Sequence, residues 1–265
     1  MTAATISTLM ALALTGQSAQ PVNVRMGDGQ VNGENIKPYN FTWQQCSFKD
    51  GSWNAGNPLS EKATIIDDNL LRIEQSGLIS GDIRNRTTYY LDRRSLSPRY
   101  SERIFSTPNG KTVADQRWHF DKDGYRSVMI KGAETKNKSG SLTSQMFDAM
   151  ILGVPLSTLD FGKNGFVLKA FMAQFDGTYT LIAHKTGSEI TVQDNEEISI
   201  NWIDVKWLHD QSGDIYPPGP QNSGGRYWIT NVQHQTLPRV IRYQTDSYAI
   251  EYLQGTCPVP SKEVK

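Results

Sequence analysis

Short turn sequences recur between runs of alternating apolar and polar residues, and they constrain the fold of this chain more than any other feature. Asn-Gly at 109–110 and Asp-Gly at 123–124 separate such runs, and the same dipeptides recur at 164–165 (Asn-Gly) and 176–177 (Asp-Gly). Tight hairpin turns need a positive φ at their central residues, which Asn, Asp and Gly tolerate. The pattern predicts antiparallel strands joined by hairpins.

The same pattern extends along most of the chain and leaves no linker that would divide it. The expected strands are 41–48, 62–75 with a turn at 67–69, 86–93, 99–106, 112–120, 125–132, 178–185, 188–194, 197–209, 226–233, 237–244 and 247–255. The polar stretch 133–141 and the Pro- and Gly-rich stretch 210–225 are expected as loops. We therefore expect a mainly β chain, with an antiparallel meander over 98–184 that is interrupted once.

The interruption contains the one segment with helical periodicity, "SQMFDAMILGVP" at 144–155. Ser141 can cap a helix, and Gly153 followed by Pro155 supplies a stop, so a helix is expected over 141–152. Its docking side chains, at helical spacing, are Leu142, Met146, Phe147, Met150, Ile151 and Val154. A helix this short is marginal alone and must dock on the sheet, either as a permanent plug or as a lid over a ligand.

Charge composition limits the classes of partner. Lys plus Arg number 27 and Asp plus Glu number 27, so no net charge attracts nucleic acid or an anionic membrane. We expect no nucleic-acid partner and no transmembrane span. The sequence leaves the oligomeric state open.

The N-terminal residues predict export. Ile6 to Leu14 is an apolar run followed by small and polar residues, and it is shorter than the roughly 20 apolar residues that cross a membrane. No Lys or Arg precedes the run, so a buried N-terminal helix is the alternative. We expect a periplasmic or secreted protein with a signal peptide (1–20), a flexible lead-in (21–40), a single β-rich domain (41–257) and a C-terminal tail (258–265).

The two cysteines, Cys46 and Cys257, stand near the two ends of the expected domain. An oxidising compartment favours a disulfide between them. The alternative is two unpaired, buried thiols. Neither cysteine belongs to a CxxC motif, so redox catalysis and zinc binding have no support.

Catalytic and metal-binding motifs are missing from the sequence. The chain has no HExxH motif, no GxSxG elbow and no phosphate-binding glycine pattern. We predict no catalytic residue, no cofactor and no metal. A carboxylate pair for glycoside hydrolysis stays open, because its separation is spatial and the fold would have to assemble it.

Aromatic and basic residues gather in the C-terminal third. Along 201–209, Ile203, Val205 and Trp207 would face the core, and Trp202 on the other face could be a sugar or lipid platform or simply pack. Trp228 stands beside arginines that could bind an acidic head group by bidentate contacts. These arginines are Arg226, Arg239 and Arg242. The alternative is surface arginines stacked on aromatic rings.

Three stretches together resemble a family of uncharacterised exported bacterial proteins with a LolA/LolB-like fold. They are "TTYYLDRRSLSPRYSER" (87–103), "MILGVPL" (150–156) and "RYWITN" with "LPRVIRY" (226–243), and the resemblance covers roughly 60–255. It implies a strongly curved antiparallel sheet, an incomplete β-barrel, whose open apolar side is covered by helices. In LolA and LolB that cavity receives lipoprotein acyl chains. This chain differs in having one expected helix and no lipobox cysteine after the leader.

We therefore expect a non-enzymatic, envelope-related protein that binds a lipid-like or other apolar ligand in the concavity of a curved sheet, with one short helix on the concave face. The candidate ligand-binding residues are Met146, Phe147, Met150, Trp228, Arg239 and Arg242. One alternative is a secreted β-sandwich enzyme acting on polysaccharide, with Trp202, Trp207 or Trp228 as sugar platforms. Another is a structural envelope protein with a filled core.

The export hypothesis predicts that the leader is removed and that the mature protein begins near Gln20. The apolar run and the small residues before Pro21 are the physical reason. The intact mass of protein recovered from its native host measures this. A cytoplasmic form that retains Met1 would contradict export.

Overall fold

The structure is a computed structural model that describes residues 20–79, 82–142, 146–162, 165–173, 177–210, 224–230, 237–252 and 256–258. Most of the expected leader, most of the 210–225 insertion and residues 259–265 lie outside the described residues. The domain boundaries expected in those regions therefore stay predictions.

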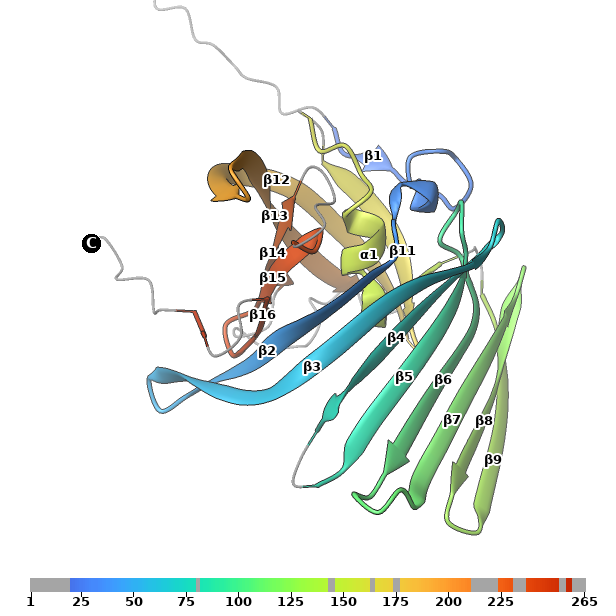
Figure 1. The fold of residues 1–265 in the computed structure, drawn as a ribbon. Helices are drawn as coiled ribbons and strands as arrows, with labels where there is room; N and C mark the ends of the chain where they lie inside the picture. The colour runs from blue at the N-terminus through green and yellow to red at the C-terminus, as the bar shows by residue number, and fades with distance from the viewer. Residues whose placement is uncertain are drawn as a thin grey trace, which may run out of the picture.

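A first antiparallel meander runs in chain order and forms one wall of the molecule (Figure 1). Its strands are β2 (Tyr39–Lys49), β3 (Ser52–Asp67), β4 (Leu70–Leu78), β5 (Arg84–Asp92), β6 (Pro98–Ser106), β7 (Thr112–Asp121), β8 (Gly124–Lys131) and β9 (Glu134–Ser141). Between β2 and β3, Asp50 and Gly51 have φ values of 53° and 77°. These positive angles explain why Asp-Gly suits the turn.

A second meander forms the other wall, also in chain order. Its strands are β11 (Phe166–Met172), β12 (Gly177–Gln193), β13 (Glu196–His209), β14 (Gly224–Thr230), β15 (Val240–Gln244) and β16 (Tyr248–Glu251). The remaining elements are short: β1 (Val22–Asn23), η1 (Gly33–Asn35), β10 (Phe147–Asp148), η2 (Ala149–Ile151) and α1 (Gly153–Leu156). The mainly β prediction is confirmed.

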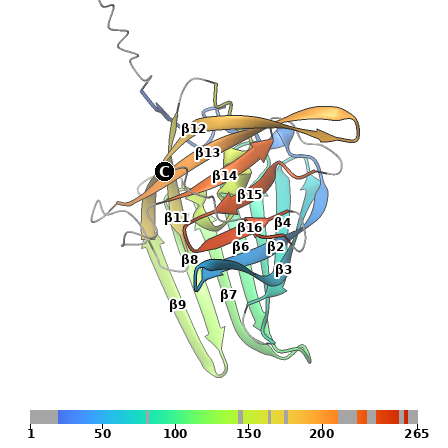
Figure 2. The same ribbon diagram turned by 90° about the vertical axis from the view of Figure 1, so that its left-hand side faces the viewer.

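The two meanders form a single 16-stranded sheet because the last strand pairs with the second. Ala249 of β16 lies opposite Cys46 of β2, in an antiparallel ladder of four residue pairs. Figure 2 shows β16 beside β2. The sheet is not closed: β9 is one edge, and the other edge is β11 with β1 and β10 paired along it.

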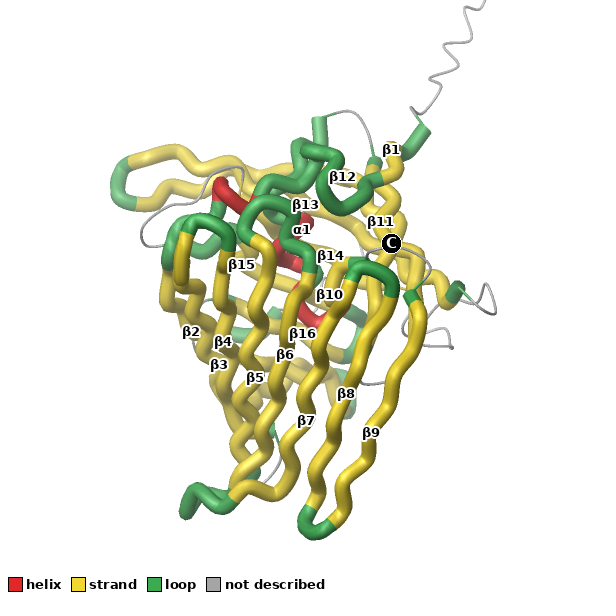
Figure 3. Tube along the Cα trace, turned by 90° about the vertical axis from the view of Figure 1, so that its right-hand side faces the viewer, coloured by secondary structure: helices red, strands yellow, loops and turns green. Residues whose placement is uncertain are grey.

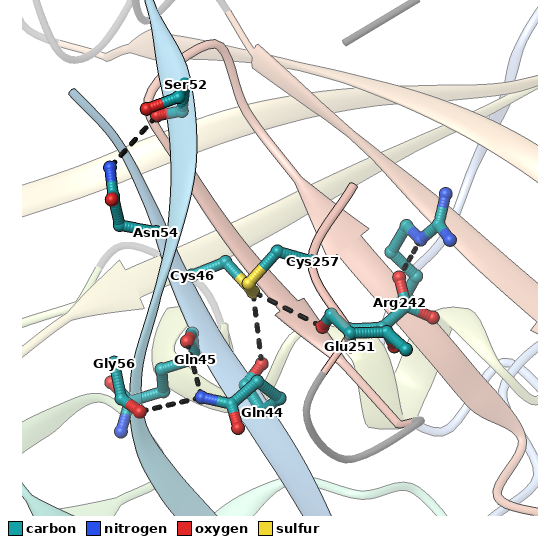
Figure 4. Close-up of a disulfide and its surroundings, with 10 residues drawn as sticks. Gln44, Gln45, Cys46, Ser52, Asn54, Gly56, Arg242, Glu251 and Cys257 are labelled. Atoms are coloured by element: carbon teal, nitrogen blue, oxygen red, sulfur yellow. Dashed lines mark hydrogen bonds and ion pairs between the residues drawn. A yellow bond between two sulfur atoms is a disulfide. The ribbon is translucent and has the colours of Figure 1, made fainter. Parts of the chain in front are cut away.

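A disulfide joins Cys46 to Cys257 at this junction, with the Cα atoms 5.8 Å apart (Figure 4). Cys46 is buried, and its partner Cys257 lies in the short described segment 256–258. The predicted pairing of the two cysteines is confirmed. It links positions separated by 211 residues.

The main hydrophobic core lies between the two walls. It combines Leu71 and Ile73 of β4 with Leu181 of β12 and Val205 of β13. The η2–α1 segment lies between the two walls (Figures 1 and 3) and also contributes to this core. The expected lead-in also contributes Val24, Val31 and Ile36 to this core. The space between the two walls is thus largely filled by the protein itself.

The helix expected over 141–152 is wrong in its position. Strand β9 continues to Ser141, Phe147 and Asp148 pair in parallel with β11, and the α-helix covers only Gly153–Leu156. The stop residues Gly153 and Pro155 therefore lie within the helix. The apolar residues recur because the segment is enclosed on several sides, as the burial of the consecutive residues Ile151 and Leu152 indicates.

The loop expected over 133–141 is also wrong, because residues 134–141 form β9. Nearly every residue of this strand is exposed, so the sequence lacks the alternation that marks a half-buried strand. Ladder hydrogen bonds to β8 hold it in place. Its lysines, Lys136 and Lys138, suit an edge strand because charge discourages pairing with another chain.

A second, smaller cluster connects the two ends of the open sheet through side chains. Phe171 of β11 packs against Tyr125 of β8 and Phe120 of β7, with ring centroids 4.8 and 6.2 Å away. Trp118, Leu142 and Met146 are the other buried members of this cluster. The opening is therefore bridged by aromatic packing instead of a hydrogen-bonded ladder.

None of the helices in the described part of the chain has the length and apolar character needed to cross a lipid bilayer.

Replacing Cys46 and Cys257 together with Ala should lower the free energy of unfolding by about 2–5 kcal/mol, because the unfolded chain gains conformational freedom when so long a loop is opened. Urea unfolding followed by tryptophan fluorescence measures this. Reduction of the wild-type protein should give the same loss. A change below about 1 kcal/mol would show that the β2–β16 ladder holds without the disulfide.

Candidate functional site

Between the two walls lies an open space that both walls line, which we call the concave groove. Its volume is about 390 Å³. Its apolar and aromatic lining is Trp43, Leu59, Leu78, Ile79, Ala149, Met150, Ile151, Leu152, Val154, Met172, Trp207, Tyr227, Val240, Tyr243, Tyr248 and Ile250, and its polar lining is Gln45, Glu61, Gln75, Asn85 and Arg103. The groove lies beside the η2–α1 segment and not beneath a long helix.

Strand register explains why polar residues reach this apolar groove. Cross-strand partners point to the same face of a sheet. Glu61 of β3 pairs with Gln75 of β4, and Gln75 pairs with Thr87 of β5. Thr87 in turn pairs with Arg103 of β6, and Arg103 with Gln116 of β7. These five residues form a polar row across the inner face of the first wall.

Glu61 is held by donors from its own wall. The hydroxyl of Tyr39 donates to Oε1 over 2.7 Å, and Nε2 of Gln75 donates to Oε2 over 2.6 Å. Burial raises the pKa of Glu61, while these two hydrogen bonds oppose the rise. Both carboxylate oxygens therefore already have partners within the sheet.

Arg103 has a different environment. Its Nε donates to Oδ1 of Asn85 over 3.1 Å, and its guanidinium lies 4.8 Å from the ring centroid of Phe105. Within the described ranges, no carboxylate forms an ion pair with it. Burial lowers the pKa of Arg103, although an arginine side chain keeps its charge at neutral pH.

Asp148 is a fully buried carboxyl group at the start of η2. Its Oδ1 accepts the backbone N–H of Met150 over 2.9 Å, which fixes the turn that places Met150 at the groove. Burial raises the pKa of Asp148 to about 7, and the hydrogen bond from Met150 only partly offsets this. The protonation state of this residue therefore changes near neutral pH.

The three predicted residues of the expected helix are separated by the fold. Met150 lines the groove and is 40% exposed. Phe147 is buried in the main core, and Met146 belongs to the smaller cluster at the sheet opening. Of the three, only Met150 is placed to touch a ligand in the groove.

Trp228 and Arg242 lie on the outer face, because their neighbours Tyr227 and Tyr243 point into the groove. The guanidinium of Arg242 lies 4.8 Å from the Trp228 ring centroid and pairs with Glu251. This arrangement favours the alternative in which surface arginines stack on aromatic rings.

The other two predicted arginines also lie apart from the groove, one on the outer face and one beside a separate cavity. On the outer face, Arg226 pairs with Asp204 and lies 5.7 Å from the ring centroid of Trp202. Arg239 lines a separate cavity of about 30 Å³ next to Tyr39 and Glu61, and its guanidinium is mostly buried.

Sequence reasoning missed the polar row entirely. The only available signal was a charged or amide side chain at an inward position of a strand, such as Arg103 two residues after the buried Ser101. The part of the chain that the structure describes holds no group of three His, Cys, Asp or Glu side chains that could bind a metal.

Compared with models of known families, with curated proteins and with solved structures, the chain matches none.

The buried Asp148 predicts a specific pH dependence of stability. Its folded pKa lies above the ordinary value of 3.8, so the folded state holds an extra proton between the two values. Its stabilising contribution is complete below about pH 4 and is lost as pH rises towards 7, with an upper bound of about 4 kcal/mol. Glu61 acts in the same direction, whereas Asp92 and Asp210, whose pKa values are lowered, act in the opposite one.

Asp148→Asn keeps an acceptor for the Met150 N–H and removes the charge. The variant should match the wild type near pH 4 and exceed its free energy of unfolding by about 1–4 kcal/mol at pH 8. Urea unfolding of both proteins across this pH range measures the difference. The contributions of the other titrating groups are the same in both proteins, so they cancel. A difference that does not change with pH would contradict the assignment.

Proposed function

We propose that this chain is an exported binding protein that holds a lipid-like or other apolar small molecule in the concave groove. The observation that carries the proposal is the cavity of about 390 Å³ between the two walls, within the roughly 300–1,000 Å³ range typical of ligand pockets. Its lining is mainly apolar, with a few polar groups gathered on one wall. Ligand pockets have this composition because apolar contacts supply affinity and polar groups supply orientation.

The fold that we propose is of the LolA/LolB kind, with a strongly curved open sheet around a short helical segment. The open sheet and the η2–α1 segment between its walls support this. An envelope-related role follows from the same resemblance. Because the η2–α1 segment is mostly buried, we regard it as a fixed part of the groove wall and not as a lid.

Export is supported by the disulfide, since such bonds persist mainly in oxidising compartments. The apolar leader points the same way. The periplasm or the cell exterior is therefore the compartment that we propose.

The groove favours binding over polysaccharide hydrolysis. Glycoside hydrolysis commonly needs two carboxyl groups, and among the described residues that line the groove Glu61 is the one carboxylate. Trp207 is buried in the main core, and Trp202 and Trp228 are engaged with arginines on the outer face. Of the three suggested sugar platforms, only Trp207 lines the groove, so they do not converge on it.

A charge placed in the apolar lining should weaken binding of an uncharged apolar probe. We expect Met150→Glu to lower the affinity for N-phenyl-1-naphthylamine at least tenfold, because the probe would force the carboxylate out of water. Met150 is partly exposed, so the variant should stay folded. Fluorescence titration of protein stripped of co-purified lipid measures the affinity.

The matched control is Ile190→Glu, which makes the same chemical change at a residue that is 68% exposed and outside the groove lining. This control should bind the probe as the wild type does. No saturable probe binding by the wild type would reject the proposed function and favour a structural protein with a filled core. Equal losses in both variants would reject the groove as the site.

A further inference from the structure

Resting on the proposed function, we infer that the ligand is a single-chain amphiphile with an anionic head group, and that Arg103 binds that head group inside the concave groove. The shared chemistry is a carboxylate or a phosphate monoester at one end of an alkyl chain. Both match the planar fork of N–H donors that a guanidinium presents.

The first argument is the unused hydrogen-bonding capacity of Arg103. A guanidinium has five N–H groups, and Asn85 accepts only the one on Nε. Arg103 also lines the groove, so its side chain borders the space where a ligand would lie. A partly buried cation without a charged partner is costly, and an anionic ligand would remove that cost.

The second argument compares Arg103 with three arginines on the outer face of the sheet. Arg226 pairs with Asp204, Arg242 with Glu251, and Arg117 with both Asp115 and Glu102. Those pairs lie on the outer face of the sheet. Arg103 thus faces an apolar groove without the carboxylate that these outer-face arginines have.

Glu61 is not positioned to neutralise Arg103. Its two oxygens accept from Tyr39 and Gln75, and it stands three strands away from β6 along the polar row. At about 4.8 Å per strand this is about 14 Å along the sheet. Asp148 accepts the Met150 N–H and does not line the groove.

The lining also gives the ligand a direction. Arg103 and Asn85 stand on β6 and β5, whereas Trp43 stands on β2 and Ile250 on β16. From β6 to β2 there are four strand spacings, about 19 Å along the curved sheet. We place the head group at Arg103 and the alkyl chain across β4 and β3 towards β2 and β16.

Four probes with the same alkyl chain test the inference by isothermal titration calorimetry at pH 8, each below its aggregation threshold. They are dodecanoate, monododecyl phosphate, dodecanol and dodecyltrimethylammonium. The wild type should bind at least one of the two anions at least tenfold more tightly than dodecanol, and the cation more weakly than dodecanol. Which anion binds more tightly distinguishes a carboxylate from a phosphate head group.

Arg103→Gln should reduce the preference for the anion over dodecanol to less than twofold, while its affinity for dodecanol stays within twofold of the wild type. Arg103→Lys keeps the charge and should restore part of the preference. The matched control is Arg86→Gln on β5, an exposed residue whose strand partner is Ile104, which neighbours Arg103 but points to the opposite face. It should leave the preference unchanged.

The outcomes separate the two proposals. If none of the four probes binds, the proposed function fails. If dodecanol binds as tightly as the anions, if the cation binds best, or if Arg103→Gln keeps the preference, the role of Arg103 is overturned while the apolar groove stands. Near-ultraviolet circular dichroism checks that each variant is folded; if Arg103→Gln is not, Arg103→Lys and the wild-type comparison of the four probes still decide.

Discussion

The pairing of β16 with β2 is the interaction on which the rest of the structure depends. Each meander forms from local hairpins, but only this ladder, with the Cys46–Cys257 disulfide beside it, makes them one sheet. It brings β13–β16 to face β3–β6 across the core and so supplies both sides of the groove. A ligand site between the walls requires this non-local contact, and a covalent bond secures it.

The η2–α1 segment decides how much of the concavity remains open. Phe147, Leu152 and Leu156 are almost fully buried among residues of both walls, so their removal would leave cavities in the main core. Met150, at the turn fixed by Asp148, is where this filled region meets the groove. The segment is thus a buried part of the core with one side chain, Met150, at the groove.

Local signals explain which parts of the fold were predictable. The hairpins at 67–69 and 109–110 follow from turn residues alone, and the disulfide follows from the expected compartment and the positions of two cysteines. The helix was misplaced because burial on several sides imitates a helical repeat, and β9 was missed because neither of its faces is buried. The polar row could not be predicted, since it brings Glu61 and Arg103 to one face only through the register of four consecutive strands. Alternation places Trp228 and Tyr227 on opposite faces, but only the tertiary fold decides that Tyr227 points inward.

The central claim, that an amphiphile lies in the concave groove between the two walls, is tested most directly by photo-crosslinking. Dodecanoate carrying a diazirine at the end of its chain would be irradiated with the protein, and the labelled peptides would be mapped by mass spectrometry. The account predicts labels on groove residues of β2, β15 or β16, such as Trp43, Val240 or Ile250, which an excess of unlabelled dodecanoate suppresses. Labels confined to the outer face around Trp202 and Trp228, or labels that competition does not suppress, would contradict it.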